Sequence, residues 1–272
     1  MTKIFLCIAV LLFACVNQSF QENDVASVAE INVNVPISNT SKVIHVMVAL
    51  CDNKYQGIVP VPKAIGNGQD PANNLYWGCA YGIKTFFKRS KQWALLKSVK
   101  SDSPIMERLV FKHKQYNYFL VADAYNGMYI KHCTDMFLKS LAGKTKDTLH
   151  VNGTVLGING NAKLLSYIGH NGLMDFELPD DYKNTDDASR DAIMLACYSK
   201  NYFSRYVKSA KAAPLLWSTG LMAPEAYVLH DALQAYIAAE GNTAIKEKAA
   251  KAYAQYQKCS IKAARNLLVG GF

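Results

Sequence analysis

The fold is decided by two stretches of sequence, AKLLSYIGH (Ala162–His170) and RDAIMLAC (Arg190–Cys197). Each is an apolar run of strand length that stops at a residue capable of acid–base or nucleophilic chemistry, with loop-forming residues close behind. If the two strands are parallel neighbours, His170 and Cys197 emerge at the same edge of one sheet. Open α/β folds place their active sites at that edge.

A histidine beside a cysteine is what a cysteine hydrolase needs. A thiol at neutral pH attacks a carbonyl group quickly only when an adjacent base or its surroundings favour the thiolate. His170 on the neighbouring strand end would supply that base. The plainer alternative is that Cys197 is a small core residue and His170 an ordinary polar cap of a strand.

The rest of the chain alternates strand and helix patterns. VIHVMVALC (Val43–Cys51) and YNYFLVAD (Tyr116–Asp123) are near-continuous apolar runs, as expected of strands that are buried on both faces. Further segments are predicted as helices over 75–89, 127–141, 201–209, 224–240 and 243–268, a strand over 213–219 and a hairpin or turn over 151–161. This alternation predicts an α/β fold with a mostly parallel central sheet and helices on both faces.

Polar residues gather at the predicted carboxyl edge of this sheet. Asp52 and Asp123 follow or end their strands as His170 and Cys197 do, so all four are expected to face one cleft if the strands are parallel. Asp52 or Asp123 would orient the imidazole or bind a cationic substrate side chain. Three acids, Asp52, Asp175 and Glu225, are candidates for a pocket that accepts a basic side chain.

The two strand ends also carry a resemblance. YIGHNG (Tyr167–Gly172) followed by LACYS (Leu195–Ser199) is similar to the histidine and cysteine strand ends of caspase-like peptidases, the group of caspases, legumain, clostripain and gingipains. PLLWSTGLMAPEAY (Pro214–Tyr227) resembles the strand and loop that help to shape the specificity pocket in that group. The resemblance implies a caspase-like three-layer sandwich, with Cys197 as the nucleophile and His170 as the general acid and base.

The oxyanion donors implied by this resemblance are the backbone N–H groups of Cys197 and of a residue near Gly172. In the family a glycine usually follows the histidine directly, whereas Asn171 stands between His170 and Gly172 here. The sequence therefore predicts a peptidase that cleaves peptide bonds, and it leaves three alternatives open. These are a catalytically inactive caspase-like protein or another α/β envelope protein that binds a peptide or glycan, and a cysteine hydrolase or transpeptidase that acts on cell-wall peptides.

The N-terminus has the pattern of an export signal. One lysine precedes the apolar run IFLCIAVLLFA (Ile4–Ala14), which is too short to span a bilayer comfortably. We expect a signal peptide over residues 1–21, a linker over 22–42 and a single α/β domain over 43–272. In an alternative interpretation Cys15 is lipidated and attaches the protein to a membrane. The expected location is the periplasm, the extracellular space or, for a lipoprotein, the outer membrane.

Charge and composition restrict the classes of partner and cofactor that are expected. The net charge of +9 comes largely from lysines that stud predicted helix faces, and no nucleic-acid-binding module is present, so the expected partner is a peptide or protein substrate and not a nucleic acid. The cysteines have no zinc-site spacing, and no metal or other cofactor is predicted. The acids at 180–181, 186–187 and 191 leave calcium binding open, although an exposed acidic loop is the favoured interpretation.

Overall fold

The computed structural model describes residues 36–38, 40–179 and 181–272, and all of these belong to one compact unit. The predicted signal peptide, Cys15 and most of the predicted linker lie outside the described residues. Within them, no helix combines the length and the apolar character that a membrane span requires.

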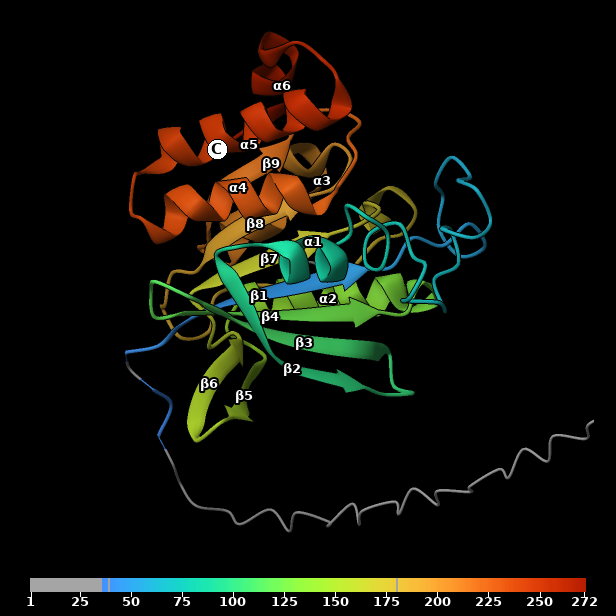
Figure 1. Ribbon diagram of the computed structural model, residues 1–272. Helices are drawn as coiled ribbons and strands as arrows, with labels where there is room; N and C mark the ends of the chain where they lie inside the picture. Colours follow the sequence, from blue (N-terminus) through green and yellow to red (C-terminus); the bar gives the residue numbers. More distant parts are fainter. Residues whose placement is uncertain (1–35, 39, 180) are drawn as a thin grey trace, which may run out of the picture. The chain divides into compact units, whose positions relative to one another are not determined.

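An eight-stranded sheet forms the centre of the fold, with the order β10-β9-β8-β7-β1-β4-β3-β2 (Figure 1). The strands are β1 (Lys42–Ala49), β2 (Trp93–Lys100), β3 (Ile105–His113), β4 (Tyr118–Tyr125), β7 (Leu164–Ile168), β8 (Asp191–Leu195), β9 (Ala213–Ser218) and β10 (Leu268–Val269). The five strands from β9 to β4 run parallel, while β10, β3 and β2 pair antiparallel with their neighbours. The predicted α/β fold with a mostly parallel sheet is confirmed.

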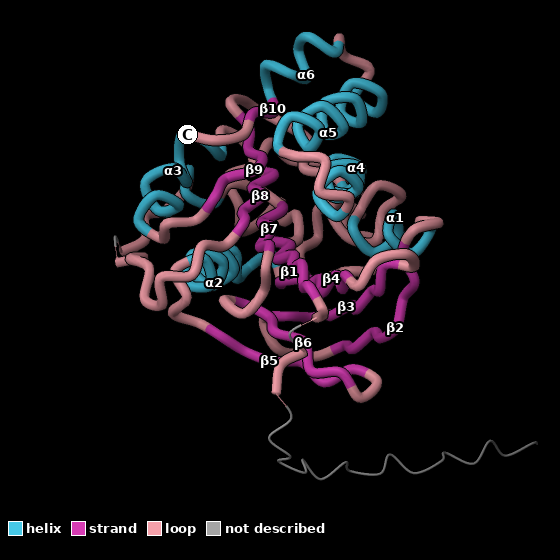
Figure 2. Tube along the Cα trace, turned by 90° about the vertical axis from the view of Figure 1, so that its left-hand side faces the viewer, coloured by secondary structure: helices cyan, strands magenta, loops and turns pink. Residues whose placement is uncertain are grey.

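Helices cover both faces of the sheet (Figure 2). They are α1 (Ile83–Arg89), α2 (Ile130–Leu141), α3 (Ser199–Ser209), α4 (Ala226–Ile237), α5 (Asn242–Gln257) and α6 (Ile261–Leu267), together with two 3₁₀ turns, η1 (Gly127–Tyr129) and η2 (Gly172–Met174). Alternate side chains of β1 point to opposite faces, so Ile44 and Val46 join the core under α1, α4 and α5, while Val43 and Met47 join the core under α2 and α3.

A hairpin of β5 (Lys146–Val151) and β6 (Thr154–Asn159) packs against the same face as α2. Its turn is Asn152-Gly153, in which both residues have positive φ (48° and 76°). Asn-Gly is the residue pair that favours a tight hairpin turn with this backbone. The Gly- and Asn-rich segment predicted as a hairpin or turn therefore forms the second strand and its flanking turns.

The predicted helix over 75–89 is wrong for its first half, since α1 begins only at Ile83. Gly78 and Gly82 lie against backbone: a Cβ on Gly78 would stand 1.9 Å from the Ala72 carbonyl oxygen, and one on Gly82 2.4 Å from that of Trp77. The chain before α1 is therefore coiled into close turns. Asn74, which directly precedes the predicted helix, is fully buried and bonded to the backbone of Cys51 just after β1.

The chain differs from the prediction at two further places. The single helix predicted over 243–268 is broken at Lys258, which takes a left-handed backbone (φ 54°), into α5 and α6, and Leu268 then pairs with β9. The β2–β3 hairpin was not predicted, because β2 at the sheet edge is mostly exposed and its apolar run covers only Trp93–Leu96. A bulge between Leu95 and Lys97 interrupts its pairing with β3.

Candidate active site

His170 and Cys197 leave the sheet side by side. In the parallel pairing of β7 and β8, Ile168 is the partner of Leu195, and each strand ends there. His170 and Cys197 both follow two residues later, at the carboxyl edge. Gly169 makes this exit possible, since its φ is 144° and a Cβ would stand 2.6 Å from the carbonyl oxygen of Ala49 in β1. The structure thus places the two predicted catalytic residues at the same edge of the sheet, at equivalent positions after adjacent strands.

His170 is held by a carboxylate. Its side chain is 6% exposed, and Nε2 lies 2.7 Å from Oδ2 of Asp175. Asp175 follows the short turn η2, so the acid folds back toward the histidine five residues earlier. The same Oδ2 atom accepts a hydrogen bond of 2.9 Å from the backbone N–H of Gly57. The sequence suggested Asp175 only as a pocket acid; its contact with the imidazole depends on the η2 turn.

The Cys197 thiol lies between two loops. The N–H of Met222, in the loop after β9, points at Sγ from 3.4 Å, and the Met222 carbonyl oxygen lies 3.6 Å from Sγ. Asn171 Nδ2 donates a 2.7 Å hydrogen bond to the carbonyl oxygen of Cys197. Asn171, the residue that departs from the family pattern, therefore ties the histidine loop to the cysteine loop.

Cys197 stands in a sharp turn from strand to helix. The next residue, Tyr198, has φ 50° and ψ 30°, a left-handed conformation that is costly for a bulky side chain. Helix α3 begins directly afterwards at Ser199, and its first turn contains no acidic residue. The N-terminal end of a helix carries a partial positive charge that stabilises a nearby anion. Backbone strain and a helix N-terminus beside a thiol are features of reactive cysteine sites.

The implied oxyanion donor at Gly172 lies beside the hydroxyl of Tyr167. The Gly172 N–H faces the hydroxyl of Tyr167, which in turn donates a 2.7 Å hydrogen bond to the carbonyl oxygen of His170. Burial raises the pKa of this tyrosine well above its ordinary value, so the hydroxyl keeps its proton. By contrast, the backbone N–H of Cys197 has no acceptor among the residues that the structure describes. Of the two proposed donors, that of Gly172 has the Tyr167 hydroxyl beside it, and that of Cys197 has no such neighbour among the described residues.

Asp123 does not reach the carboxyl edge. Strand β4 continues past it to Tyr125, and its carboxylate is fully buried inside the sheet. Arg108 donates to both oxygens, at 2.6 and 2.7 Å, and His45 Nε2 lies 2.9 Å from Oδ2. The expectation that Asp123 ends a strand and contacts the imidazole or a substrate is therefore corrected, because the acid belongs to a buried ion-pair network.

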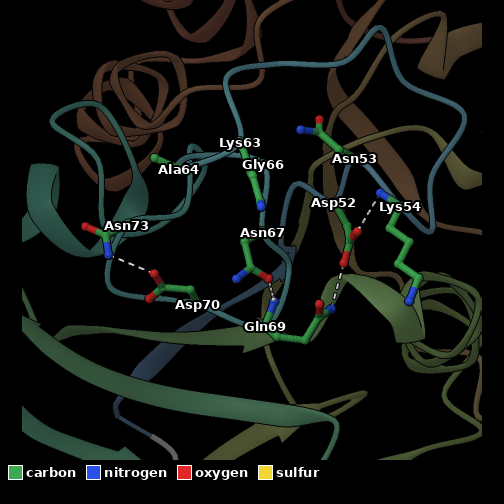
Figure 3. A pocket seen from close by; sticks show the side chains of 10 residues that line it. All are labelled: Asp52, Asn53, Lys54, Lys63, Ala64, Gly66, Asn67, Gln69, Asp70 and Asn73. Carbon is green, nitrogen blue, oxygen red and sulfur yellow. Dashed lines mark hydrogen bonds between the residues drawn. The ribbon is translucent and has the colours of Figure 1, made fainter.

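Asp52 lies at the carboxyl edge but is 2% exposed. Its Oδ1 accepts the backbone N–H groups of Lys54 and Tyr55, at 2.8 and 3.2 Å, and its Oδ2 accepts a 2.6 Å bond from Gln69 Nε2. Asp52 therefore organises the loop after β1 and contributes to the wall of a cavity there. Figure 3 shows this carboxylate with Gln69 below it and Lys54 beside it.

Glu225 precedes α4, in the same loop as Met222. Its Oε2 accepts hydrogen bonds from the Tyr227 hydroxyl (2.9 Å) and from Gln257 Nε2 (3.1 Å). Burial raises the pKa of this carboxyl above its ordinary value. Burial raises the pKa of Tyr253, and the nearby Cys197 and Glu225 raise it further. The hydroxyl of this tyrosine accepts a hydrogen bond from the N–H of Ala223. Glu225 is thus the predicted acid whose loop also contacts the thiol.

The acidic segment between the two strands is divided among separate partners. Asp186 pairs with Arg190 and Lys146, while Asp191 accepts a bond from the Tyr236 hydroxyl. Across residues 36–38, 40–179 and 181–272, no three histidine, cysteine or acidic side chains converge as metal ligands.

Comparison of the chain with models of known protein families, with curated proteins and with solved structures finds no match. The functional argument therefore rests on the fold and on the geometry of the site.

Proposed function

We propose that the protein is an exported cysteine hydrolase of the caspase-like type that cleaves peptide bonds. The observation that supports this most is the matched exit of His170 and Cys197 from adjacent parallel strands, with Asp175 bonded to the imidazole. The α/β fold with helices on both faces agrees with the resemblance of the two strand ends to that group.

In the proposed reaction the Cys197 thiolate attacks the peptide carbonyl carbon. His170 then gives a proton to the leaving amine, and a water molecule, deprotonated by His170, hydrolyses the acyl-enzyme and restores the thiol. Because Nε2 of His170 donates to Asp175, Nδ1 is the nitrogen left for these transfers. Asp175 orients the ring and stabilises the imidazolium. The free N–H of Cys197 would stabilise the oxyanion.

A second candidate is a catalytically silent binding protein with the same fold. It is favoured by one observation, the Tyr167 hydroxyl beside the Gly172 N–H, which would compete with an oxyanion for one of the two donors that the resemblance implies. A cysteine hydrolase or transpeptidase acting on cell-wall peptides shares the proposed residues and differs from the peptidase only in substrate.

Thiol reactivity separates the two candidates. The protein is treated under native conditions with a limiting amount of iodoacetamide from pH 5 to 9, and each cysteine is followed by mass spectrometry. The other cysteines are internal controls: burial raises the pKa of the Cys51 thiol to about 11, and burial with Glu225 raises that of Cys79. Selective alkylation of Cys197 at neutral pH, slowed in His170→Ala, is the expected result.

If Cys197 reacts no faster than Cys79 and Cys259 in the folded protein, the hydrolase proposal fails and the binding protein takes its place. Cys259, which like Cys79 is partly exposed, serves as the accessible reference thiol. Substrate profiling with peptide libraries follows a positive result, and Cys197→Ala must then abolish turnover while the fold is retained.

A further inference from the structure

A cavity of about 780 Å³ opens in the loop after β1, apart from the histidine and the cysteine (Figure 3). Neither His170 nor Cys197 lines it. Its wall is formed by residues between Asp52 and Asn73; apart from Ala64 and Gly66 these residues carry polar or charged side chains, whose carbon atoms also face the cavity. This volume lies within the range of small-molecule sites, which is ~300–1,000 Å³. No large apolar side chain lines the cavity.

Two carboxylates in this wall are fixed by amide side chains. Asp52 accepts a bond from Gln69 Nε2, and Asp70 accepts one of 2.7 Å from Asn73 Nδ2. Backbone N–H groups hold each acid as well, including that of Ala72 on Asp70 at 3.0 Å. These side chains are therefore ordered before any ligand arrives, which lowers the entropy cost of binding.

The groups left over on the wall are both donors and acceptors. The donors are Asn67 Nδ2 and Lys63 Nζ, and the acceptors are the amide oxygens of Gln69 and Asn73. None of these four atoms has a hydrogen-bond partner within the described residues. Lys63, Asn67 and Gln69 are also exposed and so within reach of a ligand. A hydroxyl group can donate and accept at once, so it matches such a mixed wall.

Formal charge on the wall cancels. Two lysines, Lys54 and Lys63, and two acids, Asp52 and Asp70, line the cavity, and neither lysine forms an ion pair with a carboxylate of the described residues. An anion would meet the two acids, and a cation would meet the two ammonium groups. A neutral ligand avoids both costs.

We infer that this cavity binds a neutral, hydroxyl-rich ligand of the saccharide class. Sugar hydroxyls would bond to Asn67, Gln69 and Asn73, and Lys63 would donate to a ring or hydroxyl oxygen. This inference does not depend on the proposed hydrolase activity.

The test is titration of the full protein with four methyl glycosides, those of glucose, mannose, galactose and N-acetylglucosamine, followed by saturation-transfer NMR and calorimetry. At least one should bind. Lys63→Ala should weaken binding about fivefold, the value expected for the loss of one hydrogen bond. Asn67→Ala should weaken it by a similar factor. Lys91→Ala, an exposed lysine outside the cavity, should leave binding unchanged.

Lys63 has no partner within the described residues, so Lys63→Ala should unfold at the wild-type temperature, and lost binding then reports the cavity. The inference is overturned if none of the four glycosides binds at about 50 mM, a concentration that would nearly saturate a site with a Kd of about 1 mM. Binding of citrate or phosphate that is lost in Lys63→Ala also overturns it and marks an anion site. Alkylation of Cys197 should match wild type in Lys63→Ala, so failure of this inference and failure of the hydrolase proposal are distinguishable.

Discussion

Asp175 Oδ2 lies 2.7 Å from Nε2 of His170 and fixes which imidazole nitrogen is left for chemistry. The contact is made by a turn of the chain and not by a neighbouring strand, because η2 brings the acid back to the strand end. The histidine is therefore oriented by its own loop, while the cysteine loop is held by Asn171.

Replacing Asp175 by asparagine keeps the shape of the side chain but removes the charge that stabilises the imidazolium. We expect Asp175→Asn to slow the alkylation of Cys197 at pH 7 by at least about tenfold, a modest share of what acid–base partners contribute. Rates from mass spectrometry across pH 5 to 9 provide the check. Asp187→Asn, at an exposed acid paired with Lys211, is the matched control and should not change the rate.

A substitution at Gly57 should also disturb the contact between Asp175 and His170. A Cβ at this position would stand 2.3 Å from Oδ1 of Asp175, so Gly57→Ala should turn the carboxylate away from His170. Because Gly57 is exposed and only a side chain must move, the free energy of unfolding should change by less than about 1 kcal/mol. Alkylation of Cys197 should slow as in Asp175→Asn.

Gly153→Ala should show the opposite pattern. A Cβ there meets nothing within 4 Å, but the φ of 76° is strained for alanine, which costs about 1 kcal/mol. The hairpin turn is remote from Cys197 in the fold, so alkylation should stay at the wild-type rate. An unchanged rate in Gly57→Ala would show that Asp175 does not act on the thiol through His170.

The buried network around Asp123 should make stability depend on pH. Burial alone would raise the pKa of the Asp123 carboxyl, but hydrogen bonds from Arg108 and His45 outweigh it and hold the pKa below its ordinary value. A lowered folded-state pKa contributes stability above the unfolded value of about 4 and loses it as the pH falls further. Urea unfolding at pH 7 and at pH 3 should show this loss.

Asp123→Asn removes the partner of a largely buried guanidinium and should lower the free energy of unfolding at pH 7 by roughly 3 kcal/mol. The difference from wild type should shrink at pH 3, where the wild type has lost the same contribution. Asp187→Asn, whose acid is 89% exposed, should change stability by less than about 1 kcal/mol at either pH. Equal effects of the two substitutions would contradict the assignment.

Asn74 joins the strand end to the cavity loop. Its side chain bonds to the N–H and carbonyl of Cys51, to the carbonyl of Asn67 and to the N–H of Tyr76. Asn74→Ala would leave these buried groups without partners and should cost roughly 3 kcal/mol. Limited proteolysis should then begin within residues 52–82. Asn201→Ala, at an exposed site on α3, should stay within about 0.5 kcal/mol of wild type.

The central strands were predictable because burial on both faces leaves a continuous apolar run, as in Val43–Cys51. The proximity of His170 and Cys197 followed from the same logic, since parallel strands that are neighbours share a carboxyl edge. The edge strand β2 was not predictable in this way, because most of its residues are exposed and its apolar run is limited to Trp93–Leu96. The prediction also lacked β3, whose pairing with β4 continues past Asp123 to Tyr125.

The helix expected over 75–89 failed for a different reason. Aromatic residues such as Tyr76 and Trp77 do pack into the core, as a helix face would, but they do so from turns that the contacts of Gly78 and Gly82 impose. Close backbone approach between distant segments leaves no periodic signal in a sequence. The same holds for Asp175, whose partner is set by one short turn.

The two edges of the sheet also differ in how they meet other molecules. Strand β10 closes one edge with two residues, whereas β2 offers eight, with Leu95, Leu96 and Val99 partly exposed along it. Lys97 and Lys100 and the bulge beside Leu95 oppose pairing with a second copy, as does the net charge of +9. Charge repulsion therefore helps to prevent self-association at this edge. High salt, which screens the charges, or acetylation of those lysines should promote pairing of two copies along β2.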